Sequence, residues 1–220
     1  MAAVPWRMNV LETVIISLLP QVDRLNIYLN SWEITPDFLT HPKINAVRSQ
    51  DAIGDLGATG KFFWCEKIKG IHLTVDDDIM YPSDYVETIL SGMKRNKNCI
   101  VTFHGSILKT KKYREKELLS HFAKHTAEDI SVSVGGTGVM AYYSKDVVFS
   151  LDAFQSNLWA DGWVAIQAKR ENIPIIALKH DKDWLKPLPT TGPDIWTMNK
   201  QEERTAQINN WIVKHGLLED

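Results

Sequence analysis

Three consecutive carboxylates, Asp76, Asp77 and Asp78, follow a short apolar run at residues 71–75. The apolar and β-branched residues of this run predict a strand that is buried on both faces. Adjacent like charges repel one another unless a positive group neutralises them, and a divalent metal is the simplest such group. Carboxylate ligands suit Mg²⁺ or Mn²⁺, which complete their coordination with phosphate oxygens and water. The triplet therefore predicts a metal site that can hold a diphosphate; the alternative is a turn whose Asp residues only cap a helix. Along an extended chain, Asp76 and Asp78 would point to one side and Asp77 to the other.

A second carboxylate, Asp161, lies between Trp159 and Trp163, just before a predicted helix at residues 164–170. Partly apolar surroundings make a carboxylate a stronger base, and such a base can take the proton of an attacking hydroxyl. Asp also favours the N-cap of a helix, where it has no catalytic role. Catalysis and capping are therefore the two interpretations of Asp161.

Four further features are candidates for binding. Lys61 ends a glycine-rich segment, which we interpret as a helix start that delivers this lysine towards a bound nucleotide, the alternative being a solvated side chain. His104 follows a predicted strand and should look into the cleft beside the strand ends, although a single histidine is more often structural. The basic run at residues 109–116 is either a solvated face or a contact to an acidic polysaccharide or a membrane surface. Gly138 ends a second glycine-rich segment, where missing side chains would let the backbone approach a ligand closely.

Apolar periodicity predicts the elements that position these residues. Residues 2–4 predict a first strand, and apolar residues at helical spacing from Val10 to Leu19 predict a helix that Pro20 ends. Asn9 and Glu12 have a variant of the capping-box spacing at its start. Further strands are predicted at residues 24–29, 44–48, 71–75, 99–103 and 173–178, two strands joined by a glycine-rich turn at 131–143, and helices at 81–93 and 201–215. This order predicts an α/β fold with a mostly parallel central sheet flanked by helices, in which ligands bind at the carboxyl ends of the strands.

The composition is that of an ordinary globular chain. The 220 residues are 44% hydrophobic and 24% charged, enough for one large core, and we predict one domain over residues 1–220. A net charge of −2 argues against a nucleic-acid-binding protein, which would carry a basic excess. Cys65 and Cys99 lie far apart and predict neither a zinc site nor a disulfide framework. No apolar run is long enough to span a bilayer, so a cytoplasmic location is predicted.

Several of these segments together resemble a known family. They are Pro5-Trp6-Arg7, the run from Leu11 to Asp23, Tyr28-Leu29-Asn30, Gly60-Lys61-Phe62, and Asp76-Asp77-Asp78 with Tyr81-Pro82 and Asp84-Tyr85. From its first strand to about Lys182, the chain resembles bacterial nucleotide-sugar glycosyltransferases of the GT-A type and is similar to glycosyltransferase family 2. The resemblance implies a Rossmann-like GT-A domain with a DXD motif that transfers a sugar from a nucleotide diphosphate, UDP being favoured, to a hydroxyl of a glycan or glycolipid, with inversion. It also implies a role in making bacterial surface polysaccharide, either capsule or lipopolysaccharide.

The resemblance and the positions at strand ends assign roles to individual residues. The donor nucleotide sugar would be contacted by Pro5, Trp6, Arg7, Gln50, Lys61, Asp76, Asp77, Gly138, Lys179 and Lys182. The metal would be bound directly by Asp78, with Asp76 near the metal or the ribose and His180 as an additional ligand that suits Mn²⁺ better than Mg²⁺. The resemblance places the base of an inverting transfer on Asp161. Residues 185–200 would form a lid loop that orders over the bound donor.

Three alternatives stay open at this point. A retaining glycosyltransferase or a nucleotidyltransferase on the same fold would keep the metal but would not need Asp161, and a non-catalytic glycan-binding domain would need neither. The first predicted strand has hardly any residues before it, so the chain is also interpretable as one domain of a longer synthase. A glycolipid acceptor would be compatible with peripheral association at the inner face of the cell membrane, and no nucleic-acid partner is expected.

Overall fold

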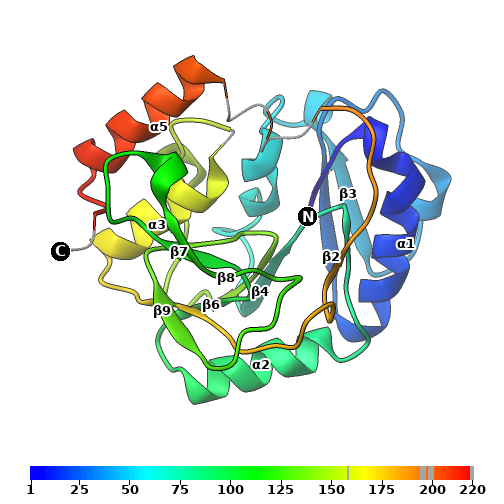
Figure 1. The fold of residues 1–220 in the computed structure, drawn as a ribbon. Coiled ribbons are helices and arrows are strands. Elements are labelled where there is room, and N and C mark those ends of the chain that lie inside the picture. Colours follow the sequence, from blue (N-terminus) through cyan, green and yellow to red (C-terminus); the bar gives the residue numbers. More distant parts are fainter. Residues whose placement is uncertain (158, 194–196, 198–200, 219–220) are drawn as a thin grey trace.

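The first strands of the chain form a parallel sheet, as predicted (Figure 1). The structure is a computed structural model that describes residues 1–157, 159–193, 197 and 201–218. The sheet has the order β1 (Ala2–Ala3), β2 (Leu25–Leu29), β3 (Ile44–Arg48), and both pairings are parallel. Helix α1 (Met8–Leu18) connects β1 to β2 and ends in a 3-10 turn (Leu19–Gln21) that contains Pro20. These strands and this helix are confirmed within one or two residues at their ends.

Helix α1 begins without the capping box that Asn9 and Glu12 predict. Arg7 occupies the N-cap and makes no side-chain capping hydrogen bond. The chain enters α1 directly from a 3-10 turn (Pro5–Arg7), so the residues at the start of the helix are already fixed by that turn. The side chain of Arg7 is thereby free to reach the acidic triplet, as described below.

The larger sheet is mixed, which corrects the prediction of a mostly parallel central sheet. Its order is β4 (Ile71–Val75), β11 (Val139–Tyr143), β6 (Ile100–Thr102), β12 (Ile175–Ala177), β9 (Ile130–Val132). Only β6 and β12 are parallel neighbours, because β11 lies antiparallel between β4 and β6, and β9 runs antiparallel to β12. Strand β4 is therefore at the edge of this sheet, and Ile71 is 46% exposed. The prediction that this strand is buried on both faces is wrong.

The two strands predicted at residues 131–143 do not form one hairpin. Strands β9 and β11 lie in the five-stranded sheet without pairing with each other. Between them, β10 (Val134–Gly135) joins a separate antiparallel sheet of order β10, β7 (Gly105–Ile107), β8 (Glu117–Ser120). The chain then turns back into β11 through residues 136–138. A Cβ at Gly136 would lie 2.9 Å from the Cβ of His104, so this turn passes closely over the end of β6.

The described residues that follow form three further α-helices, together with short elements. The helices are α2 (Tyr85–Arg95), α3 (Ala160–Arg170) and α5 (Glu202–Lys214). The short elements are strands β5 (Ile79–Met80) and β13 (Lys186–Pro187), which pair with each other, and 3-10 turns at Asp37–Leu39, Ser49–Asp51, Gly57–Phe62, Tyr113–Glu115 and Leu151–Ala153. The predicted helix at 81–93 starts late, because the Tyr85 N–H bonds to the Pro82 carbonyl in a turn before α2 begins.

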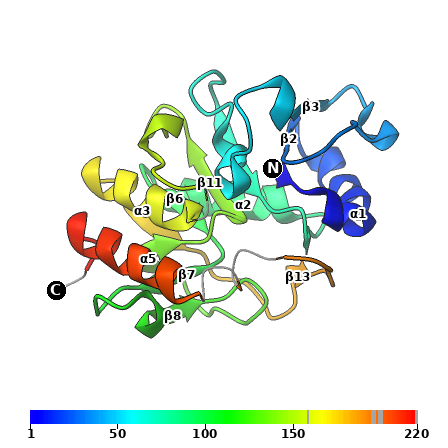
Figure 2. The same cartoon turned by 90° about the horizontal axis from the view of Figure 1, so that it is seen from above.

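Helices cover both faces of the five-stranded sheet (Figures 1 and 2). One apolar cluster joins α1 and α2 to β2 and one face of the sheet, and a second joins α3 and α5 to the other face. Neighbouring residues of β11 alternate between them, since Ala141 belongs to the first cluster and Met140 to the second. Trp159 and Trp211 stack with ring centroids 5.8 Å apart and thereby dock α5 beside the start of α3. Among the described residues, no helix has the length and apolar character needed to cross a bilayer.

Candidate active site

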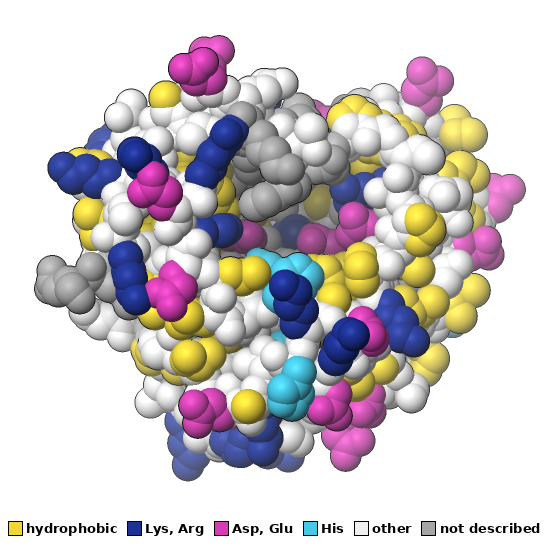
Figure 3. Space-filling model, viewed as in Figure 1, with side chains coloured by type: hydrophobic (Ala, Val, Ile, Leu, Met, Phe, Trp, Pro, Cys, Tyr) yellow, Lys and Arg dark blue, Asp and Glu magenta, His cyan; other side chains and the backbone are white. Residues whose placement is uncertain are grey.

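A pocket of about 910 Å³ lies beside the carboxyl ends of β1, β2, β4 and β6, at the kind of position predicted for a ligand. Figure 3 shows this hollow, with acidic and basic side chains meeting inside it. Its volume is within the range of small-molecule sites. The predicted residues that line it are Trp6, Arg7, Lys61, Asp76, Asp77, Asp78, His104, Gly138 and Asp161. The structure therefore brings the acidic triplet and the proposed base into one cavity.

Two cations of the chain pair with the acidic triplet. Arg7 Nη1 lies 2.6 Å from Asp77 Oδ1 and 3.0 Å from Asp78 Oδ2. Lys61 Nζ pairs with Asp76 Oδ1. Asp77 and Asp78 thus share one partner while Asp76 has another, so the expected alternation of side chains is wrong. The physical reason is that the chain turns immediately after β4 instead of continuing as a strand.

Within the triplet, the pKa of Asp78 is raised most clearly. Burial raises the pKa of Asp78 to about 6, and the carboxylates of Asp76 and Asp77 add to this increase against the opposing effect of Arg7. Burial also raises the pKa of Asp77, although Arg7 again opposes it. At Asp76 burial acts in the same direction, but the attraction of Lys61 outweighs it and lowers the pKa. Among the described residues, three carboxylates therefore share two cations, which leaves the cluster with one excess negative charge when all three are ionised.

Gly138 lies directly against the triplet. A Cβ at this position would overlap the Asp76 carboxylate, so any residue other than glycine would displace the Asp76 side chain. The Gly138 carbonyl accepts a hydrogen bond from the Tyr81 hydroxyl at 2.6 Å, and this hydroxyl accepts one from the Asp76 N–H at 2.8 Å. The Tyr81 hydroxyl thus links the turn that precedes β11 to Asp76 through two hydrogen bonds.

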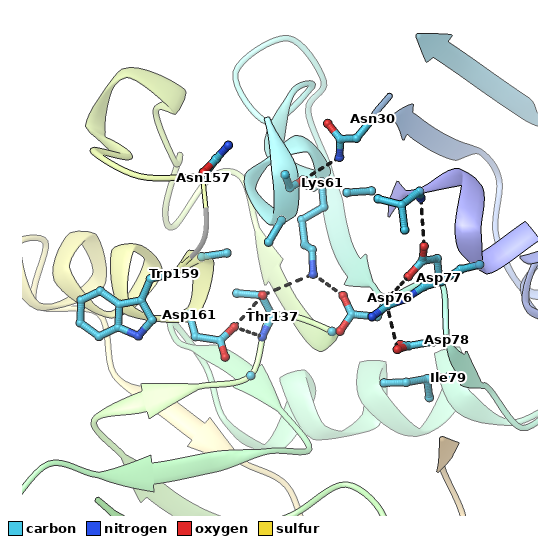
Figure 4. Close-up of a pocket in the computed structure, with 18 of the residues that line it drawn as sticks. Asn30, Lys61, Asp76, Asp77, Asp78, Ile79, Thr137, Asn157, Trp159 and Asp161 are labelled. Carbon is cyan, nitrogen blue, oxygen red and sulfur yellow. Dashed lines mark hydrogen bonds and ion pairs between the residues drawn. The ribbon is translucent and has the colours of Figure 1, made fainter. Parts of the chain in front are cut away.

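A chain of polar contacts links the triplet to Asp161 (Figure 4). Lys61 Nζ contacts Asp76 Oδ1 and lies 3.4 Å from Thr137 Oγ1. Asp161 Oδ1 accepts two hydrogen bonds from Thr137, from the backbone N–H at 2.9 Å and from the hydroxyl at 2.7 Å. The interpretation of Asp161 as an N-cap is wrong, because Trp159 occupies the N-cap of α3 and Asp161 lies inside the first turn. We call the series Asp76–Lys61–Thr137–Asp161 the polar bridge.

The wall around Asp161 is built largely from residues that the sequence interpretation did not select. Tyr113, Trp159 and Arg204 line the pocket there together with His104. Burial lowers the pKa of His104 to about 4, with Asp161 opposing the decrease, so the ring is neutral near pH 7. Its Nδ1 is buried without a hydrogen-bond partner in the described part of the chain. The expectation that His104 faces the cleft is confirmed.

Other predicted residues lie outside the pocket, and these are Pro5, Gln50, Lys179, His180 and Lys182. Pro5 begins the turn that carries Trp6 and Arg7 but does not line the cavity itself. Gln50 is exposed, and its Nε2 lies 3.4 Å from the Glu33 carbonyl. Lys182 has an exposed side chain, 4.0 Å from Asp183. Position after a strand did not suffice to bring these side chains to the site.

His180 is a structural residue of the β12 end. Its Nδ1 lies 2.8 Å from the Leu178 carbonyl and its Nε2 lies 3.1 Å from the His121 carbonyl. Both ring nitrogens therefore face backbone oxygens, and the ring is buried outside the pocket. The neighbouring Lys179 is exposed, and its backbone N–H bonds to Asp129 at 2.9 Å. The predicted metal-binding role of His180 and the predicted donor contact of Lys179 are not compatible with this placement.

The basic run and the predicted lid have ordinary packing explanations where they are described. Within residues 109–116, Lys112 pairs with Glu115 at 2.8 Å and Lys109 pairs with Glu117, so acidic neighbours balance part of this charge. The first part of the predicted lid is held by the pairing of β13 with β5 and by a 3.1 Å hydrogen bond from Trp6 Nε1 to the Pro193 carbonyl. Residues 194–196 and 198–200 of this prediction lie outside the described residues.

Comparison with known proteins does not add to this description. No protein-family model matches the chain, and no curated protein matches it either.

Proposed function

We propose that this protein is a metal-dependent glycosyltransferase of the GT-A type. It would transfer a sugar from a nucleotide diphosphate, with UDP favoured, to a hydroxyl of a glycan or glycolipid in bacterial surface polysaccharide synthesis in the cytoplasm. The observation that carries this proposal is the polar bridge, which joins an acidic cluster to a separate carboxylate across one pocket of about 910 Å³. Transfer from a sugar diphosphate needs these two groups close together, one for the leaving group and one for the attacking hydroxyl.

The triplet side of the pocket suits the diphosphate and a hard divalent cation. Burial, together with the negative charges of Asp76 and Asp77, raises the pKa of Asp78 to about 6, and a bound cation would neutralise that negative charge. In the described part of the chain, no three His, Cys, Asp or Glu side chains are grouped as a complete metal site. One or two carboxylates plus phosphate oxygens are the usual set for Mg²⁺, so Asp78 and Asp76 would hold Mg²⁺ or Mn²⁺ together with the donor. When bound, the metal would stabilise the negative charge that develops on the departing diphosphate.

On the other side of the pocket, Asp161 would act as the base. Thr137 holds Oδ1 through two hydrogen bonds and fixes the orientation of the carboxylate. Oδ2 accepts no hydrogen bond from the described residues and is available to an acceptor hydroxyl. As this hydroxyl attacks the anomeric carbon, its proton passes to Asp161 while the bond to the diphosphate breaks on the opposite face. The configuration of the anomeric carbon is inverted.

Two assays test this proposal. Thermal denaturation with UDP-sugars and Mn²⁺ should show a shift, since a ligand at 100 times its dissociation constant stabilises a protein by about 2.7 kcal/mol. With the donor that binds, Asp161→Asn should lower turnover by about 10²–10⁴-fold, the usual contribution of a general base, and leave UDP binding unchanged. Asp152→Asn, an exposed carboxylate outside the pocket, is the matched control.

The outcomes separate the alternatives. Unchanged turnover in Asp161→Asn would reject the base and favour a retaining glycosyltransferase or a nucleotidyltransferase. A glycan-binding domain without catalysis has one observation in its favour, namely that Arg7 and Lys61 already pair with the triplet. Binding of glycans without binding of any nucleotide sugar would select that alternative.

A further inference from the structure

Arg204 lines the pocket without an acidic partner among the described residues. The basic side chains lining the cavity are Arg7, Lys61 and Arg204, of which the first two pair with the acidic triplet. Arg204 forms no ion pair with a described residue, and its Nη1 is buried without a hydrogen-bond partner in the same part of the chain. A guanidinium held in this way is costly unless a ligand or partner satisfies it.

The position of Arg204 on its helix is unusual for an arginine. Ile208 and Ile212 follow at intervals of four residues and are buried in the core cluster of α3 and α5. Arg204 therefore lies on the same inward face of α5. At the first turn of the helix this face covers the pocket instead of the core, so the arginine is directed at the cavity.

The surroundings of α5 place Arg204 on the Asp161 side of the pocket. Trp211 of α5 stacks on Trp159, the N-cap residue of the helix that carries Asp161. Asn209 Oδ1 accepts a 2.8 Å hydrogen bond from the Tyr113 N–H, which fixes α5 against the other aromatic residue of this wall. The triplet, in contrast, has its own cations. The unpaired guanidinium thus belongs to the part of the cavity where the attacking molecule would lie.

We infer that Arg204 forms an anion subsite that selects an acceptor carrying a carboxylate or a phosphate close to its attacking hydroxyl. The assignment of this side to the acceptor rests on the proposed function. Arginine binds both groups through two parallel hydrogen bonds, which fixes the orientation of the bound sugar as well as its charge.

Binding of simple probes tests the inference without knowledge of the natural acceptor. The probes are 4-nitrophenyl β-glucuronide, glucose 1-phosphate, the neutral 4-nitrophenyl β-glucoside, and UDP with Mn²⁺, each titrated by calorimetry. We expect the wild-type protein to bind at least one acidic probe about tenfold more tightly than the neutral glucoside, and Arg204→Gln to lose this preference while binding UDP unchanged. Which acidic probe binds distinguishes a carboxylate from a phosphate. Arg204→Lys should keep part of the preference, and Arg24→Gln, an exposed arginine outside the pocket, should keep all of it.

Two results would overturn the inference. Equal affinity of the wild-type protein for acidic and neutral probes would show that there is no anion subsite. A loss of UDP affinity in Arg204→Gln, with the preference for acidic probes retained, would assign Arg204 to the donor diphosphate instead. Failure of the proposed function looks different, since the protein would then bind no nucleotide while Arg204 still governed the binding of acidic probes. If Arg204→Gln is unfolded by circular dichroism, the comparison of Arg204→Lys with wild type decides.

Discussion

Replacing Asp78 by Asn should stabilise the protein at neutral pH, although Asp78 is a candidate metal ligand. Asp78 has an ordinary pKa of 3.8 when unfolded and a pKa of about 6 in the folded state. At about 1.4 kcal/mol for each pKa unit, ionised Asp78 costs the fold about 3 kcal/mol above pH 6. Asn has nearly the same shape and carries no charge, so Asp78→Asn removes this cost. A binding site often contains a residue that destabilises the fold, and replacing such a residue then raises the free energy of unfolding.

The dependence on pH gives the sharper test. Because the folded-state pKa of Asp78 is raised, the protonated form favours folding, and this contribution is complete below about pH 4 and lost as the pH rises through about 6. The difference in unfolding free energy between Asp78→Asn and wild type should therefore be small at pH 4, grow up to about pH 6, and then stay constant. Urea denaturation at four pH values between 4 and 7.5 measures it.

Two controls define what refutes this reasoning. Asp152→Asn changes an exposed carboxylate outside the pocket and is the matched control. Adding Mn²⁺ at pH 7.5 should stabilise wild type more than Asp78→Asn and reduce the difference between them. If Asp78→Asn is no more stable than wild type at pH 7.5, or if the difference does not change with pH, the charge crowding deduced from the geometry is absent.

Further predictions concern the other groups of the pocket. Gly138→Ala should cost about 1–3 kcal/mol in urea denaturation, because its Cβ overlaps the Asp76 carboxylate, and should weaken binding of UDP with Mn²⁺ in calorimetry; unchanged binding would contradict this contact. Arg7→Met should lower the free energy of unfolding by about 3–5 kcal/mol in the same assay, because it removes the partner of the Asp77 carboxylate, whose side chain is only 4% exposed. A decrease below about 1 kcal/mol would show that the Arg7–Asp77 ion pair contributes no more than a pair on the surface. The ring protons of His104 should titrate near pH 4 in NMR spectra, and a midpoint near 6.5 would show that the ring is solvated.

Local sequence predicted those parts of the fold that neighbouring residues determine. Helix α1, strands β2 and β3, and helix α5 agree with their apolar periodicity, because each buries one face or one run against the core. The order of strands in the larger sheet was not predictable in the same way. Antiparallel β11 lies between β4 and β6, and nothing in residues 139–143 specifies which strands they pair with. Pairing across long separations depends on the packing of the whole chain.

In the site, too, features of neighbouring residues were predictable from the sequence, whereas contacts between distant residues were not. The acidic triplet and Asp161 were recognisable because each combines unusual charge with a characteristic position beside a strand or helix. The partners that neutralise or orient them were not, since Arg7 is 70 residues from Asp77 and Thr137 is 24 residues from Asp161. His180 was assigned wrongly because a position after a strand does not reveal that both ring nitrogens face backbone carbonyls. For Arg204, a usable signal was present in the helical spacing to Ile208 and Ile212.

Lys61 gives the polar bridge a physical role in the proposed reaction. In the structure it pairs with Asp76 and also contacts Thr137, so it stands between the acidic triplet and the residue that orients Asp161. In the proposed reaction, a metal diphosphate would bring a cation for Asp76 and an anion for Lys61, and these two residues would exchange partners with little change in the total charge of the pocket. The repulsion at Asp78 would fall in that exchange, whereas Asp161 would keep both hydrogen bonds from Thr137. Donor binding would therefore relieve strain on one side of the pocket without disturbing the base on the other, which is the arrangement that a two-substrate transfer requires.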